Sequence, residues 1–235
     1  MIIVLKPHLS KAEIEAISRE VRALGYEPRL IVGVEQCVIA CIGDERKHHT
    51  LETLTCFPGV QQVMPVQRRY KLASREAHPR NTVITVRDQK IGGKKVQVMA
   101  GPCSVESRSQ ILATARAVKS AGATFLRGGA FKPRTSPYEF QGLKKEGLEL
   151  LAEAREETGL GIVTEVLSQS DVELVARYAD ILQIGTRNAQ NFSLIQEAAR
   201  TGKPILLKRG MSMRVEEWLL AAEYVLSEGN NHVML

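Results

Sequence analysis

FLRGGAFKPRTSPYEFQG occupies residues 125–142 and joins a short apolar run to a long loop of charged residues, glycine and proline. The apolar start of this segment predicts a strand. Residues 143–158 follow as a predicted helix that ends at Gly159, since glycine commonly terminates helices. The sequence therefore predicts a strand, a long loop and a helix in succession, and the loop presents Lys132 and Arg134 soon after the strand.

The same strand–helix unit repeats through residues 96–235. Capping boxes that begin at Ser107 and Ser170 indicate where two of the helices start. The run at 96–101 is continuously apolar, as expected of a strand buried on both faces of a parallel sheet. The six predicted strands are 96–101, 125–130, 162–166, 181–185, 205–210 and one that begins at 232.

This periodicity fits two architectures. Five strand–helix units and a sixth strand fill 140 residues, whereas a closed (β/α)8 barrel needs about 200 to 250. An open, doubly wound sheet could be complete at this length. The pattern therefore predicts an α/β fold with a parallel sheet, either an incomplete (β/α)8 TIM barrel or an open sheet, and the motifs must choose between them.

Residues 1–67 have a different order of elements. Strands and helices follow one another as β-α-β-β-α-β, with the helices at Lys11–Leu24 and around Lys47–Thr55. This is the order of a small α+β ferredoxin-like domain. Cys37 and Cys41 lie on one face of an apolar strand, so we expect them to pack in the core of this domain.

The two domains are joined by a predicted linker at 68–81, which is polar, basic and contains Pro79. The strand at 82–86 and a turn at Gly92-Gly93 indicate a hairpin ahead of the repeated units. We expect the second domain to cover residues 82–235.

The composition is that of a folded protein. Apolar residues make up 44% of the 235 residues, and no apolar run reaches the roughly 18 residues of a membrane span. The first ten residues, MIIVLKPHLS, lack the pattern of a secretory signal, so a cytoplasmic location is expected. The net charge of +6 fits phosphorylated small molecules about as well as nucleic acid, and decides nothing alone.

Cationic side chains recur where the predicted strands end. Functional groups of a parallel barrel lie just beyond the carboxyl ends of its strands, and cations held together there are costly unless an anion binds. Phosphate is an anion that arginine and lysine bind well. The cations at these positions are Arg127, Lys132, Arg134, Arg187 and Lys208.

The motifs at these strand ends resemble those of the phosphoenolpyruvate-condensing aldolases. They are AGPCSVES at 100–107, LRGGAFKPRTSPYEFQG at 126–142, IGTRNAQNF at 184–192 and LLKRG at 206–210. The form Lys132-Pro133-Arg134-Thr135 resembles the branch that makes 3-deoxy-D-arabino-heptulosonate 7-phosphate (DAHP) on the shikimate pathway, rather than the branch that makes 3-deoxy-D-manno-octulosonate 8-phosphate. The resemblance implies a TIM barrel, and the first domain resembles the regulatory extension of one subgroup.

The resemblance also implies roles for single residues. Phosphoenolpyruvate would bind Arg127, Lys132, Arg187 and Lys208, and erythrose 4-phosphate would bind Lys132, Arg134 and Thr135. Cys103 would be a ligand of a divalent metal (Mn, Fe, Co or Zn), and Lys132 would donate a proton. Apart from the resemblance, Glu165 at its strand end could either orient a substrate-binding cation or cap the barrel wall. The implied partners are phosphorylated small molecules, without nucleic acid or membrane, and like chains in a tetramer.

Several alternatives stay open at this stage. The family's other metal ligands, a His, a Glu and an Asp, would lie beyond Leu235, so we expect residues 1–235 alone to be inactive. A non-catalytic chain that senses an amino acid through residues 1–67 is a second possibility, and the octulosonate branch is a third. Lys208 could instead form a Schiff base, although nothing near it indicates selective desolvation.

Overall fold

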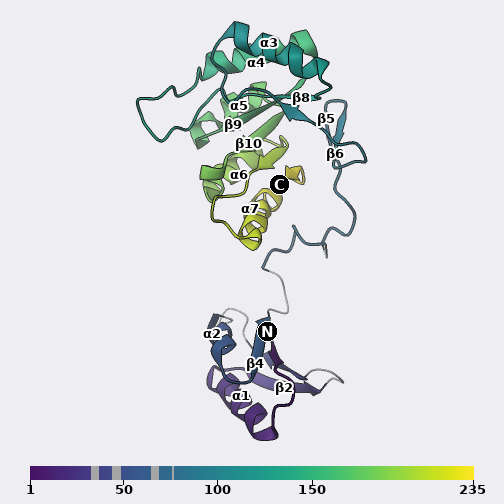
Figure 1. Ribbon diagram of the computed structural model, residues 1–235, viewed down its shortest axis with the longest axis vertical. Helices are drawn as coiled ribbons and strands as arrows, with labels where there is room; N and C mark the ends of the chain where they lie inside the picture. Colours follow the sequence, from purple (N-terminus) through teal and green to yellow (C-terminus); the bar gives the residue numbers. More distant parts are fainter. Residues whose placement is uncertain (33–36, 44–48, 65–68, 76) are drawn as a thin grey trace. The chain divides into compact units, whose positions relative to one another are not determined.

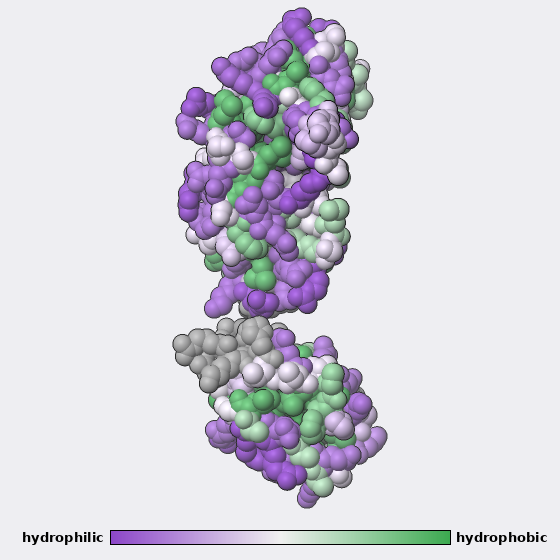
Figure 2. All heavy atoms as spheres, turned by 90° about the vertical axis from the view of Figure 1, so that its left-hand side faces the viewer, coloured by the Kyte–Doolittle hydropathy of each residue, from purple (hydrophilic) through white to green (hydrophobic). Residues whose placement is uncertain are grey.

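The computed structural model describes residues 1–32, 37–43, 49–64, 69–75 and 77–235 (Figure 1). The chain forms two compact units, Met1–Arg69 and Tyr70–Leu235. Each unit has its own core. In the space-filling view, apolar side chains are interspersed with polar ones on the visible surface of both units (Figure 2).

The first unit is a four-stranded antiparallel sheet with the strand order β2-β3-β1-β4. Its β-α-β-β-α-β order confirms the predicted ferredoxin-like domain; the start of the second predicted helix, residues 47–48, lies outside the described residues. The elements are β1 Ile2–Leu5, α1 Lys11–Ala23, β2 Glu27–Val32, β3 Cys37–Ile42, α2 His49–Glu52, the 3-10 helix η2 Thr53–Cys56 and β4 Val60–Met64.

Helix α1 begins at a complete capping box and covers one face of this sheet. The Ser10 hydroxyl accepts a hydrogen bond from the Glu13 backbone, and the Glu13 carboxylate accepts one from the Ser10 backbone, which satisfies two donors at the helix start. Ile17 is fully buried among the apolar residues of the sheet. Cys41 is buried in the same core, as predicted, and burial raises the pKa of its thiol.

The second unit is built on a six-stranded parallel sheet with the order β12-β11-β10-β9-β8-β7. Its strands are β7 Met99–Ala100, β8 Phe125–Arg127, β9 Gly161–Val166, β10 Ile181–Ile184, β11 Ile205–Leu207 and β12 Val233–Met234. Its helices are α3 Arg108–Ser120, α4 Lys145–Thr158, α5 Val172–Tyr178, α6 Phe192–Arg200 and α7 Val215–Ser227, with 3-10 helices η3 Gln169–Asp171 and η4 Thr186–Asn188. This arrangement confirms the predicted incomplete barrel.

Alternate side chains of the strands point to opposite faces of the sheet. The outward ones, such as Leu126, Ile162 and Leu182, pack against the helices in one large core. The inward ones alternate along each strand between an apolar residue and a polar or charged residue nearer the carboxyl end. The inward pairs are Phe125 and Arg127, Val163 and Glu165, Ile181 and Gln183, and Leu206 and Lys208.

A β-hairpin packs against the apolar inward residues, which lie nearer the amino ends of the strands. Strands β5 Ile84–Val86 and β6 Gln89–Ile91 pair antiparallel, and the hairpin side chains Ile84 and Val86 cluster with the inward residue Phe125. The amino-terminal end of the barrel is therefore closed by apolar packing, which leaves the polar inward residues at the other end free to form a site.

Three local predictions were wrong. The hairpin turns at Arg87-Asp88, with Arg87 at φ +54°, and not at Gly92-Gly93. The helix predicted from Ser170 is preceded by a 3-10 turn without a side-chain cap. The strand predicted at 96–101 covers only Met99–Ala100, which pairs with β8 alone at the edge of the sheet, and Val96 is 83% exposed.

Candidate active site

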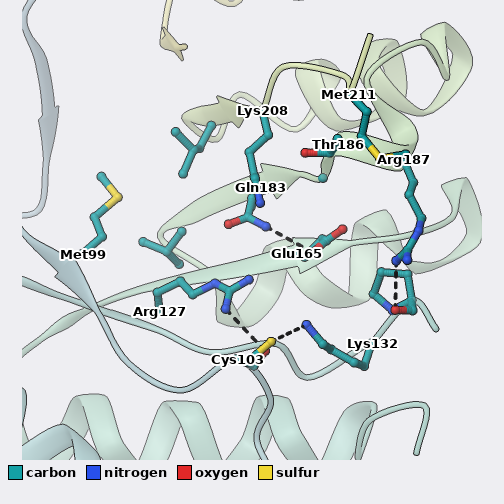
Figure 3. A pocket seen from close by; sticks show the side chains of 14 residues that line it. Met99, Cys103, Arg127, Lys132, Glu165, Gln183, Thr186, Arg187, Lys208 and Met211 are labelled. Carbon is teal, nitrogen blue, oxygen red and sulfur yellow. Dashed lines mark hydrogen bonds between the residues drawn. The ribbon is translucent and has the colours of Figure 1, made fainter. Parts of the chain in front are cut away.

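A cavity of about 610 Å³ lies at the carboxyl ends of the parallel strands (Figure 3). This is the end of a barrel where functional groups are expected. Its walls come from successive strands and from the loops that follow them. The lining residues are Met99, Cys103, Arg127, Lys132, Pro133, Val163, Glu165, Gln183, Gly185, Thr186, Arg187, Leu206, Lys208 and Met211.

Four of the five predicted cations line this cavity. Arg127 ends β8, Lys132 lies on the loop after it, Arg187 lies in η4 after β10, and Lys208 follows β11. Each comes from a different segment, and the parallel topology alone brings these segments together. Gathered positive charge of this kind favours a ligand with more than one anionic group.

The loop that carries Lys132 is closed at its base by backbone hydrogen bonds. The Lys132 amide donates to the Gln141 carbonyl at 2.9 Å, and the Lys144 amide donates to the Ala130 carbonyl at 2.8 Å. Gly142 sits between them at φ +92°, where a Cβ would come within 2.2 Å of the Ala130 oxygen. Only glycine fits there, so the sequence itself fixes the loop base and holds Lys132 over the cavity.

Lys132 and Cys103 form a direct contact in the cavity (Figure 3). The Lys132 Nζ lies 2.8 Å from the Cys103 Sγ, and Arg127 donates to the Cys103 carbonyl at 3.4 Å. The hydrogen bond from Lys132 is the main reason that the pKa of the Cys103 thiol is lowered. Burial opposes this effect, while the charge of Lys132 and the hydrogen bond and charge of Arg127 add to it. Cys103 is exposed, so a larger fraction of this thiol should be ionised and reactive than of a cysteine without cationic neighbours.

This contact predicts the alkylation rates of the cysteines. At neutral pH, iodoacetamide should modify Cys103 several times faster than Cys56, the other exposed thiol of the described residues. Lys132→Met should slow the reaction at Cys103 and leave Cys56 unchanged, because the thiolate loses its cationic partner. Peptide mass spectrometry measures both rates in one sample. Equal slowing at both cysteines, or none at Cys103, would refute the coupling.

Glu165 is the one carboxyl group among the described residues that line the cavity. It is 8% exposed, and Gln183, 3% exposed, donates from Nε2 to its Oε2 at 3.1 Å. Burial raises the pKa of Glu165, and the charges of Arg127, Lys132 and Lys208 oppose this rise. The carboxyl group therefore lies in a buried place where neighbouring cations favour its charged form.

Gly185 makes room for this carboxyl group. A Cβ at Gly185 would lie 1.8 Å from the Glu165 Oε1, so Gly185→Ala should force the carboxyl group out of place. We expect a loss of about 1–3 kcal/mol in unfolding free energy, as for other overpacked sites, measured by urea denaturation. Gly93→Ala is the matched control, since its Cβ would meet nothing closer than 3.8 Å; a similar loss in both variants would contradict the steric argument.

Arg187 connects the end of β10 to the loop that carries Lys132. Its guanidinium donates to the Pro133 carbonyl at 3.1 Å and to the Thr135 hydroxyl at 3.4 Å. Thr135 and Arg134 themselves do not line the cavity; both are exposed, and Arg134 donates to the Phe140 carbonyl at 3.2 Å. The structure therefore gathers Cys103, Arg127, Lys132, Glu165, Arg187 and Lys208, and leaves Arg134 and Thr135 on the outer part of the loop.

Two family models match the chain, one for each unit. The model of the DAHP synthase ferredoxin-like domain matches residues 1–68, and that of the DAHP synthetase I family matches residues 77–235. The chain belongs to the DAHP synthetase I family. The predicted family and the predicted transferase class are thereby confirmed.

Individual relatives agree with this assignment. The phospho-2-dehydro-3-deoxyheptonate aldolase of Thermotoga maritima is 46% identical over all of this chain, which spans 69% of that protein. Its crystal structure at 1.92 Å superposes with a TM-score of 0.76, at 44% identity over 68% of that chain. A 2-dehydro-3-deoxyphosphooctonate aldolase of Acidithiobacillus ferrooxidans is more distant, at 32% identity over 59% of this chain and 52% of its own length. The DAHP branch is therefore favoured over the octulosonate branch, as the Lys132–Thr135 motif predicts.

The family resemblance predicts a divalent metal, but the described residues do not provide a complete set of ligands for one. No group of three His, Cys, Asp or Glu side chains that could hold an ion occurs there. Cys103 offers one sulfur, and its partner is the Lys132 ammonium, whereas bound metals usually have three or more protein ligands. Cys103 and its neighbours among the described residues therefore do not make up a metal site by themselves.

Sequence reasoning missed some of the lining residues. Gln183 and Met211 were not predicted as site residues, and Gly185 and Thr186 appeared only as part of the motif at 184–192. The inward alternation gives the missing signal: Gln183 lies two residues after the inward Ile181, just as Glu165 lies two after Val163. The alternation of inward side chains along each strand would therefore have identified Gln183, two residues after the inward Ile181.

Proposed function

We propose that this cavity binds phosphoenolpyruvate and condenses it with erythrose 4-phosphate and water to give DAHP and phosphate. The observation that supports the proposal is the convergence of four cations from four segments on one cavity. Phosphoenolpyruvate carries a phosphate and a carboxylate, so it can engage several cations at once. A chain of this family with such a cavity has the charge that this substrate requires.

The cations have a chemical task beyond binding. Two phosphorylated substrates repel each other, and the fixed charges of Arg127, Arg187 and Lys208 would offset that repulsion and hold the enol carbon beside the aldehyde. The new bond joins C3 of phosphoenolpyruvate to the aldehyde carbon. Water adds at C2 and releases a proton, and the C2–oxygen bond to phosphate then breaks.

Lys132 is the proposed proton donor of this reaction. The aldehyde oxygen gains negative charge as the carbon–carbon bond forms, and the Lys132 ammonium could give it a proton. The Lys132 loop also carries Arg134 and Thr135, which we propose as ligands of the erythrose phosphate group. Both lie outside the cavity wall, so this role requires the outer part of the loop to bend inward when the second substrate binds.

Cellular location and assembly belong to the same proposal. No helix among the described residues is long and apolar enough to cross a membrane. We propose that the enzyme is cytoplasmic and that its partners are phosphorylated small molecules. We also propose that it assembles with like chains, for which the family resemblance implies a tetramer.

The test is phosphoenolpyruvate consumption with each aldehyde. Residues 1–235 are assayed alone and together with a polypeptide that supplies the part of the Thermotoga relative that the chain does not span. Consumption with erythrose 4-phosphate, and not with arabinose 5-phosphate, is expected in at least one arm, and it should be lost in Lys132→Met. Preference for arabinose 5-phosphate, or binding of phosphoenolpyruvate without product in both arms, would contradict the condensation.

A further inference from the structure

Glu165 presents a problem for the proposed function, on which this inference rests. It is the single carboxyl group among the described lining residues, and a phosphate-bearing anion must enter the same cavity. The groups that face it are Arg127 from β8, Lys132 from the loop, Gln183 from β10 and Lys208 after β11. With the cavity empty, Glu165 partly neutralises these cations; with an anion bound, its charge would repel the ligand.

We propose that Gln183 is a positioning residue that holds the Glu165 carboxyl group among the pocket cations, and that Glu165 takes up a proton when phosphoenolpyruvate enters. In the empty cavity the negative charge of Glu165 thus compensates the cations, and this charge is lost when the substrate brings its own negative charge. Neither the Gln183 contact nor the proton uptake is needed for Glu165 to serve as a wall residue.

The geometry around Glu165 is specific. The Gln183 amide donates to one carboxyl oxygen at 3.1 Å, and the other oxygen lies where a Cβ of Gly185 would be, 1.8 Å from it. Gln183 lies in β10 and Gly185 directly follows this strand, which pairs with β9 in a register that sets Gln183 beside Glu165. One carboxyl oxygen therefore accepts a hydrogen bond from Gln183. The other occupies space that any side chain at position 185 would fill.

The charges give the direction of the proton movement. Burial raises the pKa of Glu165, and the three cations and the Gln183 hydrogen bond hold this rise back. A bound phosphate and carboxylate would neutralise the same cations, and the pKa would then rise further. At pH values between the pKa of Glu165 in the empty cavity and its higher pKa in the complex, binding must therefore take up a proton. Above this window the carboxylate stays charged and weakens binding.

The first experiment needs no substrate. The titration of the Glu165 carboxyl carbon is followed by NMR in the ligand-free chain, with Glu165→Gln identifying the signal. Gln183→Leu should move the midpoint to higher pH, because the carboxylate loses its donor, whereas Gln190→Leu, at an exposed glutamine, should not. An unchanged midpoint in Gln183→Leu would overturn the positioning role.

The second experiment counts protons. Calorimetric titration of phosphoenolpyruvate in buffers of different ionisation enthalpy should show more proton uptake for the native chain than for Glu165→Gln, and that variant should bind several-fold more tightly at mildly alkaline pH. A structural defect would weaken binding and could not strengthen it. Equal proton counts in both proteins would overturn the uptake. Failure of both to bind phosphoenolpyruvate would refute the proposed function, while the NMR titration would still decide the role of Gln183.

Discussion

Affinity for phosphoenolpyruvate is expected to fall about 100-fold in Arg127→Met, which corresponds to about 3 kcal/mol. Arg127 lines the cavity, donates to the Cys103 carbonyl and acts electrostatically on Glu165. Methionine keeps much of its apolar length while removing the planar donor group. A guanidinium makes paired hydrogen bonds to phosphate that a neutral side chain cannot replace. Isothermal titration calorimetry on residues 1–235 measures the change.

Arg177→Met provides the matched control for this variant. Arg177 is an exposed arginine on α5 that pairs with Glu173 one turn away and does not line the cavity. The control should keep the native affinity, because the two variants lose the same formal charge and differ only in position. Equal losses in both variants would mean that the net charge of the chain, rather than the cavity, attracts the ligand.

The largest loss of stability is expected in Phe125→Ala, at about 3–5 kcal/mol. Phe125 is fully buried at the barrel floor, where it packs with Ile84 and Val86 of the hairpin. Removing the ring leaves a cavity that the surrounding strands cannot fill. Trp218 is the single tryptophan of the sequence and lies on α7 of the second unit, so its fluorescence in urea follows the unfolding of the barrel alone.

Phe140→Ala is the control for the stability prediction. Phe140 lies on the outer loop and is 41% exposed, so its removal should change the stability by less than about 0.5 kcal/mol. If Phe125→Ala unfolded at the same urea concentration as Phe140→Ala, the hairpin would not be packed on the barrel floor as described.

The order of elements could be predicted from sequence because each strand–helix unit carries its own local signals. The segment at 125–158 shows this well: an apolar run, a loop rich in glycine and proline, and a helix closed by Gly159 appear in the structure as β8, a loop and α4. The spacing of hydrophobic residues and the termination of helices at glycine depend on nearby residues only, so both can be recognised in a single sequence.

The wrong predictions concern features that depend on tertiary context. An apolar run such as 96–101 does not tell whether its strand lies inside a sheet or at the edge, and here only Met99–Ala100 pair. The hairpin turn uses Arg87 at a positive φ, a conformation more common for glycine, while Gly92 and Gly93 lie just after the hairpin. The pairing of β5 with β6 sets the turn in one case, and the short pairing of β7 with β8 limits the strand in the other.

The site could be predicted in part for a related reason. Strand ends are visible in the sequence, and parallel topology brings them together, so Arg127, Lys132, Arg187 and Lys208 were found. The direction of a loop side chain is not visible: Arg134 is near Lys132 in sequence, yet its guanidinium bonds the outer loop at Phe140.

The most direct test of this account is a crystal structure of the chain with phosphoenolpyruvate bound. We expect the ligand in the cavity at the carboxyl ends of the strands, with its phosphate and carboxylate in hydrogen-bonding contact with Arg127, Lys132, Arg187 and Lys208. A ligand bound elsewhere, with these four side chains turned toward solvent, would contradict the central claim that their gathered charge forms the substrate site.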